Sequence, residues 1–169
     1  MRYYLDCEFN GFGGNLLSLA LVTEHGDEFY IARDQAEMEA EARSAAPHIE
    51  PWVRDNVLPV MDCEGASPMR VGRAVAETQE FWPTHIEPFL LKYGRHEPPH
   101  IIADWPDDIA YLCRMLITGP GYAIRVPGMT FEWSRVDSYP TDLAGAIQHN
   151  ALWDARALRR ALRRPVSIE

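Results

Sequence analysis

The chain has 169 residues, a length that predicts one domain over residues 1–169, and its 47% hydrophobic and 24% charged content is typical of a globular protein. No apolar run approaches the roughly 18 residues of a membrane helix, and no signal peptide is expected, so we expect no membrane contact and a cytoplasmic location. The net charge of −9 argues against a protein coated for non-specific nucleic-acid binding, although an acidic metal site would contribute to that charge. The widely spaced Cys7, Cys63 and Cys113 match neither a disulfide framework nor a zinc site.

The N-terminal run Tyr4–Phe9 is strand-forming and carries two acids with one residue between them. Because side chains alternate along a strand, Asp6 and Glu8 are expected on the same face, with Cα atoms roughly 6.5 Å apart. Two acids in a half-buried strand repel each other and lose hydration, and a divalent cation would remove that cost. An exposed edge strand with solvated acids explains the same pattern, so the metal hypothesis needs acidic partners elsewhere in the chain.

The first 32 residues are expected to form a three-stranded antiparallel meander. Residues 10–14 form a glycine-rich turn that lacks the spacing of a phosphate-binding loop. The nearly continuous apolar run 16–22 predicts a strand buried on both faces, and residues 28–32 predict a third strand after a turn at 24–27. The strand with the two acids comes first in this meander.

The region after the meander is predicted to be helical. A helix is expected from Asp34 to Pro47, and Pro51 suits the first position of a short helix that ends at Leu58. Ser67-Pro68 is a good helix start, and an apolar stripe extends from there to Phe81 or Trp82. Pro83 and Pro88 are expected to break or kink the helical segment beyond that stripe.

A second group of acids comes directly after a short apolar run. His100–Ala103 predicts a fourth strand, and three acids (Asp104, Asp107 and Asp108) precede a helix whose apolar residues run from Ile109 to Leu116. An aspartate at a helix start has a structural explanation, since it caps backbone amides and suits the helix dipole. Three acids exceed what one cap requires. Residues 129–136 predict a strand, and residues 141–147 predict a short helix.

The C-terminal helix carries the last candidate acid. Apolar residues from Leu152 to Leu162 form its stripe, and Asp154 lies at the border of that stripe, where its carboxylate could point into a cleft. His149 precedes Asp154 by about 140° of helix rotation, so it is expected on the loop that enters the helix, free to approach the same site. Arginines either bind phosphate here or form a solvated face that balances the acidic body: Arg156, Arg159, Arg160, Arg163 and Arg164.

Together these motifs resemble the DEDDh branch of the DnaQ-like 3′-5′ exonucleases, and the similarity spans nearly the whole chain. The matching residues are Asp6-x-Glu8, Asp108 before a stretch that ends in Leu112, and His149-x-x-x-x-Asp154. Asp107 is the alternative for the second motif, and Asp104 falls where relatives often have a polar residue. Segments 52–59 and 149–156 look like the short stand-alone bacterial and phage exoribonucleases of this branch, whereas Phe9-Asn10 replaces the more usual Thr-Thr-Gly type of run.

The resemblance implies a ribonuclease H-like α/β fold, in which an antiparallel three-stranded meander and further parallel strands form a mixed sheet flanked by helices. It also implies two Mg²⁺ or Mn²⁺ ions held by the four acids Asp6, Glu8, Asp108 and Asp154, with Asp6 bridging both ions; hard carboxylate oxygens suit these metals. His149, whose unperturbed pKa is near physiological pH, would take the proton from the attacking water.

The implied activity is release of nucleoside 5′-monophosphates from the 3′ end of single-stranded RNA or a 3′ overhang, with RNA favoured over DNA, by a homodimeric exoribonuclease. Phe9 and Trp105 adjoin the metal motifs and would either stack on terminal bases or pack in the core. The alternative is a catalytically silent nucleotide or nucleic-acid binding module with the same fold. Concentrated negative charge counts against a pure binder, because it repels phosphates.

Overall fold

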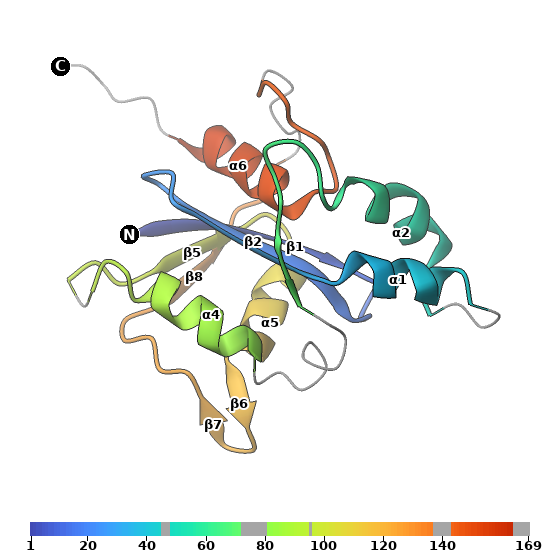
Figure 1. Ribbon diagram of the computed structural model, residues 1–169. Helices are drawn as coiled ribbons and strands as arrows, with labels where there is room; N and C mark the ends of the chain where they lie inside the picture. The colour runs from blue at the N-terminus through green and yellow to red at the C-terminus, as the bar shows by residue number, and fades with distance from the viewer. Residues whose placement is uncertain (45–47, 72–80, 95, 137–142, 164–169) are drawn as a thin grey trace.

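The computed structural model describes residues 1–44, 48–71, 81–94, 96–136 and 143–163 (Figure 1). Its centre is a six-stranded mixed sheet in the order β4-β3-β2-β1-β5-β8, and a separate hairpin pairs β6 with β7. The strands are β1 (Arg2–Phe9), β2 (Leu16–Thr23), β3 (Glu28–Arg33), β4 (Met69–Val71), β5 (His100–Ala103), β6 (Ile117–Gly119), β7 (Tyr122–Ala123) and β8 (Thr130–Trp133). The helices are α1 (Gln35–Ala42), α2 (Pro51–Asn56), the 3₁₀ helix η1 (Leu58–Val60), α4 (Phe81–Leu90), α5 (Pro106–Met115) and α6 (Ala151–Leu162).

The predicted α/β class with a mixed sheet is confirmed, and so is the antiparallel meander. β1 pairs with β2 and β2 with β3 in antiparallel register, whereas β1–β5 and β5–β8 are parallel pairs. The predicted strand at His100–Ala103 has the observed bounds of β5, and the strand predicted at 129–136 is observed as the shorter β8. β1 therefore belongs to the meander and joins it to the parallel strand β5, inside the sheet.

Alternate residues of β1 face two different helical layers. Tyr3, Leu5 and Cys7 pack in a cluster with residues of α4 and α5, whereas Tyr4 packs with Leu158 of α6. Figure 1 shows α6 on one side of the sheet and α4 and α5 on the other. The even-numbered positions of β1, which include both predicted acids, therefore face the α6 side.

The helix starts depend on local chemistry. Pro51 occupies the first turn of α2, where a missing N–H costs nothing, as predicted. Asp34 caps α1 by accepting a hydrogen bond from the backbone N–H of Glu37, and Asn150 caps α6 by accepting from the N–H of Trp153. Among the helices of the described residues, none has the length and apolar character needed to cross a bilayer.

Two predicted helical features of residues 67–90 differ from the structure. Met69–Val71 forms β4, paired parallel with β3, instead of the start of a helix; most of that predicted helix lies at 72–80, outside the described residues. α4 runs through both Pro83 and Pro88, so the helix does not break at either proline, and the alternative of a kink stays a prediction. Pro83 lies in the first turn, where no intrahelical N–H bond is needed, and Pro88 is exposed near the helix end, while the neighbouring Ile86 and Leu90 are buried.

The predicted helix at 141–147 is also wrong over the residues that the structure describes. Residues 143–147 form a bend, a turn at 144–145 and irregular backbone, and 141–142 lie outside the described part of the chain. Gly145 has a φ of 81°, in the left-handed region that ends a right-handed helix. The chain reaches α6 through a second turn at 148–149.

Candidate metal centre

Asp6 and Glu8 project from the centre of the sheet toward α6. Both belong to β1, and Asp6 pairs with Ala20 of β2 while Glu8 pairs with Ser18. Asp6 is only 9% exposed. The explanation by an exposed edge strand does not fit, since β1 lies inside the sheet and Asp6 is buried, although the part of β1 that carries the two acids extends beyond β5 and pairs with β2 alone.

A second pair of acids lies at the end of the adjacent parallel strand. Leu5 of β1 pairs with Ala103 of β5, so the chain leaves β5 beside Asp6, at Asp104. Asp108 lies in the first turn of α5 and is 2% exposed. Carboxylate oxygens of Asp6, Asp104 and Asp108 lie within 4.8 Å of one another, so these three side chains can hold a metal ion.

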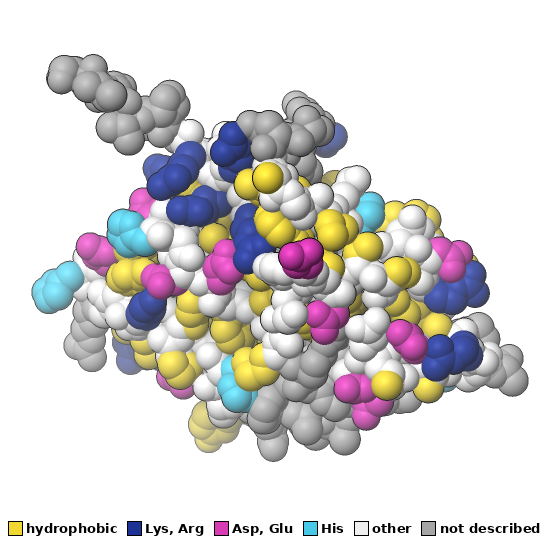
Figure 2. Space-filling model, turned by 45° about the horizontal axis from the view of Figure 1, so that its top comes forward, with side chains coloured by type: hydrophobic (Ala, Val, Ile, Leu, Met, Phe, Trp, Pro, Cys, Tyr) yellow, Lys and Arg dark blue, Asp and Glu magenta, His cyan; other side chains and the backbone are white. Residues whose placement is uncertain are grey.

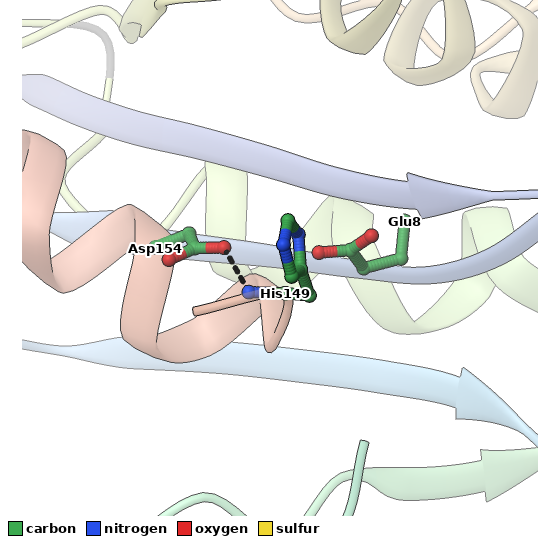
Figure 3. Close-up of side chains that lie close together, drawn as sticks. All are labelled: Glu8, His149 and Asp154. Atoms are coloured by element: carbon green, nitrogen blue, oxygen red, sulfur yellow. Dashed lines mark hydrogen bonds between the residues drawn. The ribbon is translucent and has the colours of Figure 1, made fainter. Parts of the chain in front are cut away.

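The second triad joins β1 to α6. Ligand atoms of Glu8, His149 and Asp154 also lie within 4.8 Å of one another. Figure 3 shows the imidazole of His149 between the carboxylates of Asp154 and Glu8, with Glu8 on β1 and the other two residues at the start of α6. The backbone N–H of His149 donates a 2.8 Å hydrogen bond to Oδ2 of Asp154.

The entry to α6 is held by a buried asparagine. Asn150 is fully buried, and its Nδ2 donates to the carbonyl of Val60 at 2.8 Å while its Oδ1 caps the helix. His149, directly before it, has a φ of 66°, a conformation that non-glycine residues seldom adopt. The predicted loop position of His149 is confirmed, and this turn directs its side chain toward Glu8.

Burial and mutual repulsion raise the pKa values of the two acids on β1. Burial is the largest cause for Asp6, whose pKa lies well above its usual range, and the carboxylates of Asp108, Asp154, Glu8 and Asp104 raise it further. Burial, and then repulsion by Asp154, raises the pKa of Glu8 to about 8. Acids of both triads therefore act on Asp6, which shows that the two triads are close enough for their charges to interact.

Burial is also the largest cause of the pKa shifts of Asp108, Asp154 and His149. The pKa of Asp108 is raised to about 9 by burial and then by Asp104 and Glu8. Burial raises the pKa of Asp154 to about 7, although the hydrogen bond from His149 acts in the opposite direction. Burial lowers the pKa of His149, which favours the neutral imidazole that can accept a proton.

The donor set fits a divalent cation bound by oxygen. Oδ2 of Asp108 is buried without a hydrogen-bond partner among the described residues, which leaves an orphaned acceptor in the acid cluster. The charged groups that act on Asp6 are all carboxylates, so a cation would relieve the repulsion that raises its pKa. Clusters of this kind can bind a metal ion, and their hard oxygens are the ligands that Mg²⁺ and Mn²⁺ prefer.

The structure brings together the five residues that the motifs single out, Asp6, Glu8, Asp108, His149 and Asp154, and adds Asp104 to them. Asp107 takes a different place: its carboxylate accepts a hydrogen bond from Nε1 of Trp105 at 3.0 Å, outside both triads. The geometry therefore favours Asp108 over Asp107 as the second-motif acid.

The two predicted base-stacking residues have different surroundings. Phe9 stacks on Tyr111 with ring centroids 4.9 Å apart and packs against the core, which accounts for its apolar side chain. Trp105 is 52% exposed, and its Nε1 donates a hydrogen bond to Asp107. Contact of either residue with a nucleotide stays a prediction.

Two contributors to the site have no clear signal in the sequence. Asp104 belongs to an acid cluster there, but the motif favours Asp108, and only the parallel pairing of β1 with β5 brings Asp104 to Asp6. Trp52 contacts His149 through their rings, with centroids 4.9 Å apart. The short helix that begins at Pro51 is predictable, but no local pattern connects residue 52 with residue 149.

Two arginines of the C-terminal helix, Arg156 and Arg159, form hydrogen bonds with residues of the meander. Figure 2 shows several Lys and Arg side chains gathered over the α6 end of the molecule. Arg156 makes a two-point bond to Glu28, at 2.6 and 2.7 Å, and lies over the ring of Trp153. Arg159 donates to the carbonyl of Glu24, and Arg164 lies outside the described residues. The balancing-face explanation holds for Arg156, and phosphate binding by the others stays a prediction.

No protein-family model matches the chain, and no curated protein matches it at a significant level.

Proposed function

We propose that this chain is a two-metal-ion 3′-5′ exonuclease that removes nucleoside 5′-monophosphates from the 3′ end of single-stranded RNA. The observation that carries the proposal is the meeting of the triads Asp6/Asp104/Asp108 and Glu8/His149/Asp154 around one strand, since two adjacent oxygen-rich sites are what two-metal hydrolysis requires. His149 of the second triad is half-buried, and burial lowers its pKa, so its neutral imidazole would supply a base.

The proposed fold is ribonuclease H-like. It is supported by a sheet in which an antiparallel meander continues through β1 into the parallel strands β5 and β8, with helices on both faces. It is also supported by the position of the acids. Asp6, Glu8 and Asp104 lie near the C-terminal ends of the parallel strands β1 and β5, close to the start of α6.

The protein's own residues have separate roles in the proposed reaction. Bound Mg²⁺ or Mn²⁺ ions would neutralise the charge around phosphorus and lower the pKa of a water. Asp6 belongs to one triad and is repelled by both acids of the other, so it is the residue suited to contact both ions, and Glu8, Asp108 and Asp154 would complete the ligand set. The imidazole of His149 accepts the proton of the attacking water, since burial keeps it neutral near pH 7.

The test is cleavage of 5′-end-labelled oligonucleotides in Mg²⁺ or Mn²⁺, with RNA and DNA of the same sequence side by side. We expect a ladder of products that shorten from the 3′ end, formed faster from RNA than from DNA. RNA whose 3′ hydroxyl is blocked should give no ladder. Asp6→Ala should abolish the ladder, and His149→Ala should lower turnover far more than calorimetric metal affinity. Cleavage by Asp6→Ala at the wild-type rate would overturn the proposal.

A catalytically silent nucleic-acid binding module is the alternative. It predicts RNA binding without shortening of the oligonucleotide, and it does not require two divalent ions. Titration of Mn²⁺ into metal-free protein separates the two, because the exonuclease should bind two ions per chain. Sedimentation of the same sample tests the homodimer that the resemblance implies.

A further inference from the structure

The imidazole of His149 needs an external contact to hold its direction. Its backbone is fixed by the bond to Asp154 and by Asn150 next to it, but these contacts do not reach the ring. Within the described residues the ring nitrogens make no hydrogen bond, and the imidazole lies between two carboxylates, as Figure 3 shows. A side chain held only at its backbone samples several rotamers.

Trp52 supplies a ring contact. The indole and imidazole centroids are 4.9 Å apart and their planes meet at 83°, an edge-to-face arrangement. Trp52 is 55% exposed, whereas the next residue, Val53, is 3% exposed and packs in the cluster that anchors α2. The core therefore fixes α2 through Val53, and the indole is free to serve the site.

The start of α2 is also braced to the strand that carries Glu8. The side chain of Asn10, two residues beyond Glu8, accepts a 2.8 Å hydrogen bond from the backbone N–H of Glu50 and donates another to the carbonyl of His48. Glu50 is the residue before the first turn of α2, which contains Trp52. Asn10 thus couples the end of β1 to the helix that presents the indole.

We propose that Trp52 is a positioning residue, held in place by the Asn10 brace, that keeps the imidazole of His149 directed at the Glu8 and Asp154 carboxylates. The proposal rests on the proposed function in one respect only, that His149 acts as the base in hydrolysis. The orientation itself is a property of the metal-free protein and can be measured without substrate. Removing the indole leaves the ring free to turn away while the backbone of His149 stays fixed.

The first experiment is NMR of the metal-free protein with labelled histidine side chains, in which the ring signals of His149 are those missing from His149→Gln. We expect nuclear Overhauser contacts between the Trp52 and His149 rings. In Trp52→Ala the His149 ring signals should move toward those of an unrestrained histidine, and in Trp52→Phe, which keeps an aromatic face, they should stay near the wild-type positions. Tyr122→Ala, which removes another exposed aromatic residue, is the control and should change nothing.

The second experiment measures turnover of the metal-loaded enzyme. We expect Trp52→Ala to lower kcat by about 3- to 10-fold, the range that loss of one aromatic pair corresponds to, with KM changed by less than about twofold. Trp52→Phe should restore most of kcat, and Asn10→Ala should lower kcat less than Trp52→Ala does. Thermal melting of each variant should show that it is folded, since Trp52 is more than half exposed.

Three results would overturn the inference. Unchanged His149 ring signals in Trp52→Ala would show that the indole does not orient the imidazole. A higher KM with unchanged kcat would show that Trp52 contacts the substrate instead. Equal loss of kcat in Trp52→Phe and Trp52→Ala would show that the aromatic face is not the feature that orients His149. If the wild type cleaves no oligonucleotide, the proposed function fails, and the NMR result still decides whether Trp52 orients His149.

Discussion

The backbone N–H of His149 donates a hydrogen bond to Oδ2 of Asp154, at 2.8 Å, and so one carboxylate both shapes the turn before α6 and belongs to the acid cluster. The same turn holds His149 at a φ of 66°, which costs free energy that the hydrogen bond and the Asn150 cap offset. A structural role and a metal-binding role therefore meet in Asp154, and substitutions can separate them.

Asp154→Asn and Asp154→Ala should differ in stability while both abolish activity. An asparagine keeps an oxygen that accepts from His149, so we expect the melting temperature of the metal-free protein to stay within about 2 °C of wild type or to rise. Alanine removes the acceptor and should lower the melting temperature by about 3–5 °C. Both variants should lose at least about 100-fold in metal-dependent cleavage. Equal melting temperatures would show that the His149–Asp154 bond does not hold the turn.

The metal-free protein should become less stable as the pH rises from about 4 to about 8. The folded-state pKa is about 8 for Glu8 and about 7 for Asp154, whereas carboxyl groups in the unfolded chain have pKa values of about 4. Below the pKa of the unfolded chain these carboxyl groups are protonated in both the folded and the unfolded state, so they do not lower the free energy of unfolding. As the pH rises, the unfolded chain releases its protons first, so the free energy of unfolding falls until the pH passes the folded-state values.

Calorimetry of the metal-free protein at pH 5 and pH 8.5 checks this, and we expect the melting temperature to fall by about 10 °C between them. Saturating Mn²⁺ should raise the melting temperature more at pH 8 than at pH 6, because the metal competes with protons for the same oxygens. A melting temperature that does not change with pH, or a Mn²⁺ effect equal at both values, would contradict the repulsion inferred among these acids.

Asp108→Asn should stabilise the metal-free protein at pH 8. Burial and neighbouring acids raise the pKa of Asp108 to about 9, so this carboxyl must take up a proton when the chain folds at pH 8, which lowers the free energy of unfolding. Asparagine does not titrate, so the variant avoids this cost. We expect the melting temperature to rise by about 5 °C at pH 8 and by much less at pH 4, with loss of metal binding. Asp107→Asn, outside both triads, is the control and should change either property little. Destabilisation at pH 8 would mean that the charged form of Asp108 has a favourable partner.

Gly14→Ala should be more damaging than Gly13→Ala. A Cβ on Gly14 would lie 1.8 Å from the carbonyl oxygen of Asn10, so the turn that places the Asn10 side chain would have to open. Gly13 has a φ of 71° with no neighbour within 4 Å, so alanine there meets only backbone strain. We expect losses of about 3 and about 1 kcal/mol in unfolding free energy, measured by urea denaturation. Equal losses would show that the contact with Asn10 is not the reason for glycine at this position.

The elements that the sequence predicted well are those that depend on local pattern. The alternation that puts Asp6 and Glu8 on one face, the proline at the start of α2 and the stripe of α6 each arise within a few residues, so short-range rules apply to them. The same rules failed at Met69–Val71, where pairing with β3 prevails over helical signals. At Pro88 the helix continues without a break, and the neighbouring Ile86 and Leu90 are buried.

The sequence by itself determined which residues can form the site: the acids, their strand and helix positions, and a histidine on a loop before α6. Only the tertiary structure decided which of them meet. Parallel pairing of β5 with β1 brings Asp104 to Asp6, the first turn of α5 places Asp108 and not Asp107 in the cluster, and Trp52 contacts the ring of His149. These contacts join residues far apart in the chain, and they form because the burial of two different faces of one sheet fixes α5 and α6 over the same strand.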